Sequence, residues 1–102
     1  MDTLGRIMST ALVMELVVGD LAEMEANSRQ EVANGNFKLL DNLHHFSSGC
    51  KALYTEFIYV LGDELRQACG GAGFLLSSGI TDWWSDTAPA PTFEGVNVVM
   101  TQ

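Results

Sequence analysis

The fold is decided by residues 37–68, which read FKLLDNLHHFSSGCKALYTEFIYVLGDELRQA. Side chains that are nearly all apolar recur here at intervals of three and four, which places them on one face of an α-helix. This series is Leu39, Leu43, Phe46, Cys50, Leu53, Phe57, Val60, Glu64 and Ala68. It predicts one helix from about 37 to 68. At 1.5 Å per residue that helix would span roughly 45 to 50 Å, longer than a compact domain of about 100 residues.

The residues before this helix predict a second long helix, from Leu4 to about Ala26, because apolar side chains keep the same spacing. A loop or frayed helix end is expected at about 27–36, where the turn-forming pairs Asn27-Ser28 and Asn34-Gly35 occur. Exposed apolar faces on two such helices would need further helices or a second subunit to cover them.

Beyond residue 68 the pattern changes. The glycines of 69–73 are expected to end the long helix, since glycine accepts the left-handed conformation. Residues 74–91 show neither helical nor alternating period, so we expect an ordered loop at about 70–91, held in place by Trp83 and Trp84. A short last helix is predicted with Thr92 as its N-cap, running through Glu94 to Met100. The expected fold class is therefore all-α, with two long helices and a short C-terminal one.

Composition limits what these elements can do. A chain of 102 residues, 47% hydrophobic, is enough for one small domain and is expected here as a single partial domain over 1–102. The formal charge of −8 disfavours nucleic acid as a partner. The most apolar run, 11–18, is far shorter than the roughly 20 residues of a membrane span. Two cysteines suit an intracellular chain with reduced thiols.

Targeting signals are not expected within this chain. The N-terminal segment has Arg6 as its one positive charge and also carries Asp2, which fits neither a signal peptide nor an Arg-rich transit peptide. The last three residues, Met100-Thr101-Gln102, differ from the Ser-Lys-Leu peroxisomal address. Any targeting information is therefore expected to lie outside these residues.

Several chemical motifs are weak when taken singly. His44 and His45 are adjacent, whereas a helical metal pair needs a spacing of three or four, so no metal site is predicted. The glycines of 70–73 follow a helix and lack the Gly-Lys-Ser/Thr of a phosphate loop. Glu94 is either an acid in a first helical turn or, beside Phe93 and Val96, a general base, because apolar surroundings raise the pKa of a carboxylate.

The order of these motifs is more specific than any one of them. Cys69-Gly70-Gly71-Ala72-Gly73-Phe74, then Ser78-Gly79-Ile80, then Pro91-Thr92-Phe93-Glu94-Gly95 with Asn97 and Val99-Met100 resembles the C-terminal domain of peroxisomal acyl-CoA oxidases. The upstream segments 43–52 and 66–68 are also similar to that family, so the resemblance covers about 37–102. Acyl-CoA dehydrogenases are a more distant resemblance.

The resemblance implies an activity and a set of site residues. Glu94 would remove the α-proton of a fatty acyl-CoA while the β-hydrogen leaves as hydride to FAD, giving a trans-2-enoyl-CoA and, after reoxidation by oxygen, hydrogen peroxide. Gly95 would let substrate and flavin approach the backbone. The implied cofactor-binding residues are Arg66, Gln67, Gly70, Gly71, Gly95 and Asn97. A homodimeric, peroxisomal, full-length parent is implied as well, without which this chain would be inactive.

Three interpretations remain open from the sequence. The first is a part of an acyl-CoA oxidase that works only within the full chain. The second is a non-catalytic helical subunit that kept the fold, and the third is a helical module with an unrelated binding function. Glu94 favours the first, since a structural role would not need an acid there. Val96 stands where dehydrogenases carry Thr and many oxidases Glu, which favours the oxidase branch or a diverged copy over a dehydrogenase.

Overall fold

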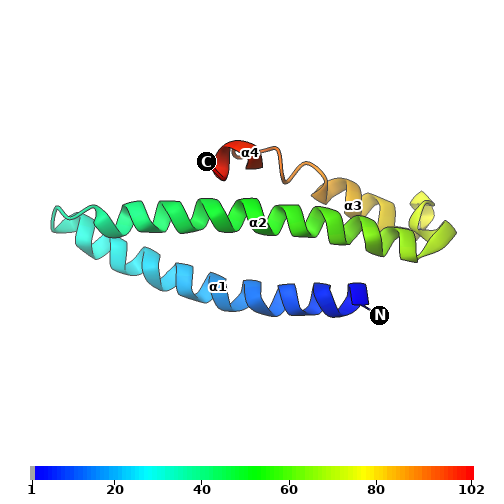
Figure 1. The fold of residues 1–102 in the computed structure, drawn as a ribbon, viewed down its shortest axis with the longest axis horizontal. Coiled ribbons are helices and arrows are strands. Elements are labelled where there is room, and N and C mark those ends of the chain that lie inside the picture. Colours follow the sequence, from blue (N-terminus) through cyan, green and yellow to red (C-terminus); the bar gives the residue numbers. More distant parts are fainter. Residues whose placement is uncertain (1) are drawn as a thin grey trace.

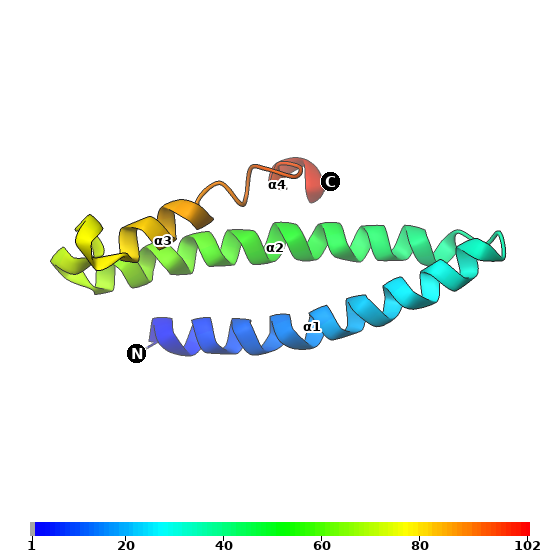
Figure 2. The same cartoon turned by 180° about the vertical axis from the view of Figure 1, so that it is seen from behind.

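Two long helices form an antiparallel hairpin that gives the molecule its shape (Figure 1). The structure, a computed structural model, describes residues 2–102. Helix α1 (Asp2–Ala33) runs along one side of α2 (Lys38–Ala68) and curves away from it toward the N-terminus, as Figures 1 and 2 both show. The short helices α3 (Ile80–Thr87) and α4 (Asn97–Met100) lie on the opposite side of α2. Two 3-10 turns, η1 (Gly70–Gly73) and η2 (Leu76–Ser78), join α2 to α3.

The all-α prediction is confirmed, and residues 2–102 contain no strand. The long helix predicted at about 37–68 is observed as Lys38–Ala68, which at 1.5 Å per residue is about 46 Å long. The molecule accordingly measures 57 × 24 × 23 Å, with a radius of gyration of 17.1 Å against the roughly 13 Å of a compact domain of this size. None of the helices within residues 2–102 is long and apolar enough to cross a membrane.

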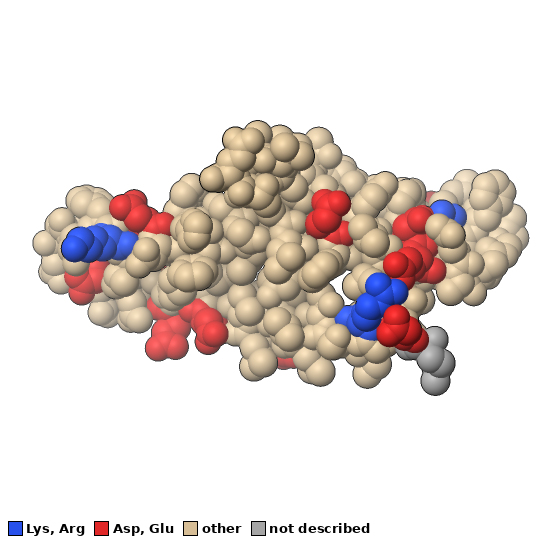
Figure 3. Space-filling model, in the orientation of Figure 1, with Lys and Arg blue, Asp and Glu red and all other residues tan. Residues whose placement is uncertain are grey.

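Little apolar surface is covered in this elongated molecule. Among residues 2–102 the buried hydrophobic side chains are Ala52 and Leu61. Large apolar side chains are exposed on α1 (Leu4, Met8, Leu12, Val13, Leu16, Val18), on or beside α2 (Phe37, Leu39, Leu40, Phe46, Leu53, Phe57, Val60) and around the chain's last turns (Phe93, Val96, Val98, Val99). Figure 3 shows that the surface over α4 carries no charged side chain on the face in view. The exposed faces predicted from the two helical patterns are therefore present.

The prediction of a loop at about 27–36 is wrong for its first part, because α1 continues to Ala33. Ser28, expected as a turn former, is buried, and its hydroxyl donates to the carbonyl of Glu25 within the helix. Arg29 forms an ion pair with Glu25 one turn earlier, and such pairs stabilise a helix. The reversal itself takes only residues 34–37, where Gly35 adopts a φ of +83° and ends α1.

The ordered loop predicted for 70–91 contains a helix that the sequence pattern did not show. Helix α3 has only eight residues, too few for a period to be visible, and its stability comes from packing on α2. The Trp84 ring lies 5.6 Å from the ring of Tyr59 and under the guanidinium of Arg66 at 5.2 Å. Gly62 of α2 leaves room for Trp83 and Trp84, whose atoms come within 3.3 to 3.5 Å of where its Cβ would be.

The predicted last helix begins later than expected, at Asn97, so the N-cap assigned to Thr92 is wrong. The amides of Thr92 and Phe93 donate to the carbonyl of Pro89 in a turn. Glu94 and Gly95 then both have left-handed backbones, with φ of +56° and +96°, which no right-handed helix can contain. Residues 92–96 are therefore a turn in front of α4.

The one acid in the α2 stripe has a partner on α1. Glu64 accepts a hydrogen bond from the hydroxyl of Thr3 and forms an ion pair with Arg6. These contacts join the first turns of α1 to the last turns of α2, at the open end of the hairpin. They explain why a carboxylate interrupts an otherwise apolar series.

We expect Gly73→Ala to disrupt the reversal after α2. A Cβ at Gly73 would lie 1.8 Å from the carbonyl oxygen of Arg66, so the backbone would have to move, at a cost of about 1–3 kcal/mol in unfolding free energy. Gly71→Ala is the matched control, because nothing lies within 4 Å of its Cβ position. Thermal unfolding followed by circular dichroism checks this, and equal melting temperatures for the two variants would contradict it.

Candidate functional site

The strongest candidate residue, Glu94, lies at the tip of a turn that is fixed at both ends. Phe93 donates its amide to the carbonyl of Pro89 at 3.1 Å, and Asn97 donates its amide to the carbonyl of Pro91 at 3.0 Å. Between these bonds the chain reverses through the left-handed pair Glu94-Gly95. For a residue with a Cβ this conformation is unfavourable by roughly 1–2 kcal/mol, and it is found at functional sites more often than elsewhere.

Lys51, near the middle of α2, holds the second half of this turn. Its Nζ donates to the carbonyl oxygen of Gly95 at 2.6 Å and to the Oδ1 of Asn97 at 2.8 Å. Hydrogen bonds from a charged donor are shorter and stronger than those between neutral groups. The residue directly after Glu94 is therefore attached to a helix 44 residues away in the sequence.

Asn97 fastens the start of α4 to α2 and is itself buried. Its Nδ2 donates to the carbonyl of Ala52 at 3.0 Å, to the hydroxyl of Thr55 at 3.0 Å and to a carboxylate oxygen of Glu56 at 3.3 Å. An ammonium can only donate, while a carbonyl and a carboxylate can only accept, so Lys51 and Ala52 fix which way the amide points. Both ends of the Asn97 amide are thus engaged inside the chain.

The carboxylate of Glu94 is exposed and has no hydrogen bond or ion pair within residues 2–102. Its apolar neighbours are also open to solvent, with Phe93 50% and Val96 42% exposed. Because α4 starts at Asn97, Glu94 lies outside the helix and Val98 is not stacked one helical turn after it. Within residues 2–102 Phe93 and Val96 therefore do not shield the Glu94 carboxylate from water. Further apolar surface would have to cover them to give the surroundings expected for a general base.

A second group of candidate residues lies at the far end of α2. Arg66 donates to Asp63 from Nε at 3.0 Å and from a terminal nitrogen at 2.6 Å, and Gln67 donates to the other oxygen of Asp63 at 2.7 Å. Gly70 follows in a left-handed conformation, with φ of +59°, and ends the helix as predicted. Gly70 and Gly71 are exposed, and nothing lies within 4 Å of their Cβ positions.

The structure does not bring the two groups together. Ala52, beside the Glu94 turn, and Arg66 are 14 residues apart on one straight helix, a separation of about 21 Å. The positive side chain of the second group is already paired with Asp63, and Asn97 of the first is used in packing. Within residues 2–102 these side chains therefore do not enclose a group the size of FAD.

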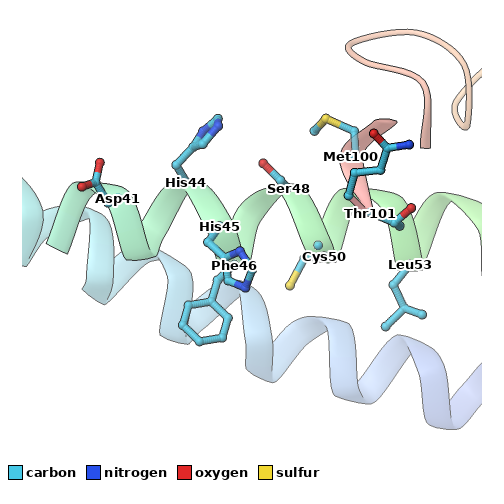
Figure 4. A pocket seen from close by; sticks show the side chains of 11 residues that line it. Asp41, His44, His45, Phe46, Ser48, Cys50, Leu53, Met100 and Thr101 are labelled. Carbon is cyan, nitrogen blue, oxygen red and sulfur yellow. The ribbon is translucent and has the colours of Figure 1, made fainter. Parts of the chain in front are cut away.

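The adjacent histidines line an open hollow of about 690 Å³ beside the end of α4. Figure 4 shows that the His44 ring points toward the α4 side of α2, while His45 points to another side with Phe46. The rings of His45 and Phe46 meet edge to face, with centroids 5.7 Å apart. No group of three or more metal-ligating side chains occurs in the part of the chain that the structure describes.

Comparisons with known proteins show the family to which the chain belongs. The chain belongs to the family described as "Acyl-CoA oxidase, C-alpha1 domain", whose sequence profile matches residues 2–102. It is 34% identical over 94 residues to peroxisomal acyl-coenzyme A oxidase 1 of Rattus norvegicus and 32% identical over 95 residues to the Homo sapiens protein of the same name. Both comparisons cover 92% of this chain and 14% of the relative.

A nematode relative extends the same result. The chain is 36% identical over 78 residues to the probable acyl-coenzyme A oxidase acox-1.5 of Caenorhabditis elegans, which covers 76% of this chain and 12% of that protein. The chain therefore spans about one seventh of the length of the relatives that it matches. The resemblance inferred from the motifs is confirmed at the level of the family.

We expect the Asp63 carboxyl to titrate below its usual pKa of 3.8, chiefly because Arg66 donates hydrogen bonds to it, with Gln67 adding another. A lowered pKa in the folded state means that the pair stabilises the chain above about pH 4 and loses this effect as the pH falls further. Carboxyl-carbon NMR should show the pKa rise toward 3.8 in Arg66→Gln. Arg29→Gln, which breaks an unrelated pair with Glu25, should leave it unchanged.

We also expect Glu94→Gly to be more stable than Glu94→Ala, by about 1 kcal/mol, because only glycine adopts the left-handed backbone without strain. At Glu23, exposed in the middle of α1, the order should reverse by about 1 kcal/mol, since glycine weakens a helix. Urea unfolding of the four variants checks this. The same sign at both positions would show that the Glu94 turn is not left-handed in solution.

Proposed function

We propose that this chain forms part of an acyl-CoA oxidase, in which Glu94 removes the α-proton of a fatty acyl-CoA during its conversion to a trans-2-enoyl-CoA with release of hydrogen peroxide. Family membership and the names of the relatives support the class of reaction. The FAD cofactor, a homodimeric parent and a peroxisomal location are part of the same proposal. The names of the relatives support the peroxisomal location, while the FAD cofactor and the homodimer rest on the resemblance to the family alone.

One observation carries the role of Glu94. It is the non-glycine residue with a positive φ within residues 2–102, and it presents an exposed carboxylate on a turn held by Lys51 and Asn97. A strained backbone around a reactive group persists only where its surroundings enforce it, and such arrangements concentrate at active sites. A turn that served only to connect α3 to α4 would be more stable with glycine at this position.

The chemistry suits a carboxylate on this turn. The α-proton of a thioester becomes acidic when its carbonyl is polarised, and a carboxylate freed of water can then accept the proton. The exposed Phe93 and Val96 offer apolar surface that a bound acyl chain or another segment would cover. Covering them would exclude water from the Glu94 carboxylate at the moment of reaction.

A non-catalytic helical subunit is the second candidate function, and the exposed apolar faces of α1 and α2 favour it. Such a subunit would bury these faces in an assembly and would need no acid at position 94. The two candidates differ in what Glu94→Gln does. This substitution strongly lowers turnover under the first candidate, whereas under the second turnover does not depend on residue 94.

The test replaces the matching segment of the Rattus norvegicus peroxisomal acyl-coenzyme A oxidase 1 with this chain and measures hydrogen peroxide release from acyl-CoA. Glu94→Gln, which keeps the shape and removes the base, should lower turnover about 10²- to 10⁴-fold while the visible flavin spectrum stays unchanged. Glu23→Gln is the matched control on the exposed face of α1 and should keep full activity. Unchanged turnover with Glu94→Gln overturns the assignment.

A further inference from the structure

Lys51 differs from the arginines of this acidic chain in what it binds. Arg6, Arg29 and Arg66 all pair with carboxylates, whereas within residues 2–102 Lys51 makes no ion pair and donates to the neutral oxygens of Gly95 and Asn97. We propose that Lys51 is a positioning residue, which holds the Glu94 turn in the orientation that proton abstraction requires. This inference rests on the proposed function of Glu94.

The two acceptors of Lys51 bracket the end of the turn. The Gly95 carbonyl belongs to the residue next to Glu94, and Asn97 begins α4, so the ammonium fixes residues 95–97 against α2. Rotation about the bonds that follow Glu94 would swing the Gly95 carbonyl away and break the 2.6 Å hydrogen bond. Lys51 thereby limits the directions in which the Glu94 carboxylate can point.

The Asn97 side-chain amide fixes the position of the Glu94 turn and α4 along α2. Its Oδ1 faces Lys51, and its Nδ2 faces the carbonyl of Ala52 and the hydroxyl of Thr55, both within four residues of Lys51 on α2. The Thr55 hydroxyl in turn donates to the carbonyl of Lys51 at 2.7 Å. A shift of α4 by one residue along α2 would take Asn97 away from both Lys51 and Thr55, so these hydrogen bonds favour the observed position of the turn.

A lysine in this position stabilises the turn and leaves the carboxylate free. An arginine or a backbone amide paired directly with Glu94 would compete with the substrate proton for the same oxygens. Lys51 instead acts one peptide unit away, through the carbonyl of Gly95, while the Glu94 carboxylate stays unbonded within residues 2–102. The strained conformation is held without occupying the reacting group.

The first arm of the test uses the 102-residue chain and does not depend on catalysis. Lys51→Met should speed amide hydrogen exchange of Asn97 and Thr101 about tenfold, while exchange along α1 stays unchanged. Lys38→Met, an exposed lysine at the start of α2, is the control and should change neither. Equal exchange in the two variants overturns the attachment, and circular dichroism confirms that the hairpin is intact.

The second arm uses the rat oxidase carrying this chain. Lys51→Met should lower kcat by about 10- to 100-fold with KM for acyl-CoA within about twofold and the flavin spectrum retained, since small misplacement of a reacting group costs rate more than binding. Lys51→Arg should restore part of kcat, because it keeps a charged donor. Unchanged kcat in Lys51→Met overturns the positioning role.

The two proposals can fail separately. If Glu94→Gln retains turnover while Lys51→Met still loosens the turn, the catalytic assignment is wrong and with it the positioning role, although the attachment stands. If Glu94→Gln abolishes turnover while Lys51→Met affects neither exchange nor kcat, only the inference about Lys51 is wrong.

Discussion

The other helices of this chain all pack along α2, a single helix of 31 residues. Its length of about 46 Å exceeds the diameter of a compact domain of this size. Helix α1 packs on one side of it, and α3 and α4 pack on the other. Each added element meets α2 through a specific contact: Glu64 with Arg6, Gly62 with the tryptophans, and the Lys51 region with Asn97. A helix held from both sides can stay straight without a large core of its own, and only Ala52 and Leu61 are buried hydrophobic residues in the described part.

The sequence predicted the parts of this arrangement that depend on repeated local spacing. The bounds of α2 could be predicted because many apolar residues recur at the same helical spacing, and its end because glycines follow it. The sequence did not predict where α1 ends, that α3 exists or where α4 begins. Each of these depends on a few particular contacts and not on a repeated spacing. Ser28 stays within α1, where it is buried and its hydroxyl donates to the carbonyl of Glu25. Trp84 lies against Tyr59 and Arg66 and holds α3 on α2.

The candidate site shows the same division. Glu94 was identified by its motif, but its left-handed backbone reverses the expectation of a helical first turn. Lys51 was missed, because nothing near it in sequence marks a lysine inside a helix as the partner of a carbonyl 44 residues later. The inferred cofactor-binding roles stay predictions for Arg66, Gln67, Gly70, Gly71, Gly95 and Asn97. In the structure these residues form two separate groups, and each group is attached to α2.

The Glu94 turn and the glycine turn are both attached to one uninterrupted helix. Their relative position is therefore set by an angle around the helix axis as well as by a distance along it. Each residue of an α-helix turns the direction of a side chain by about 100°, so Lys51 and Arg66 keep a fixed phase around the axis. Inserting or deleting one residue between them would change the length of α2 by only about 1.5 Å, yet would rotate the Glu94 turn by about 100° around the helix axis relative to the glycine turn. This stretch of α2 can therefore change freely in side chains that face solvent, but hardly at all in length.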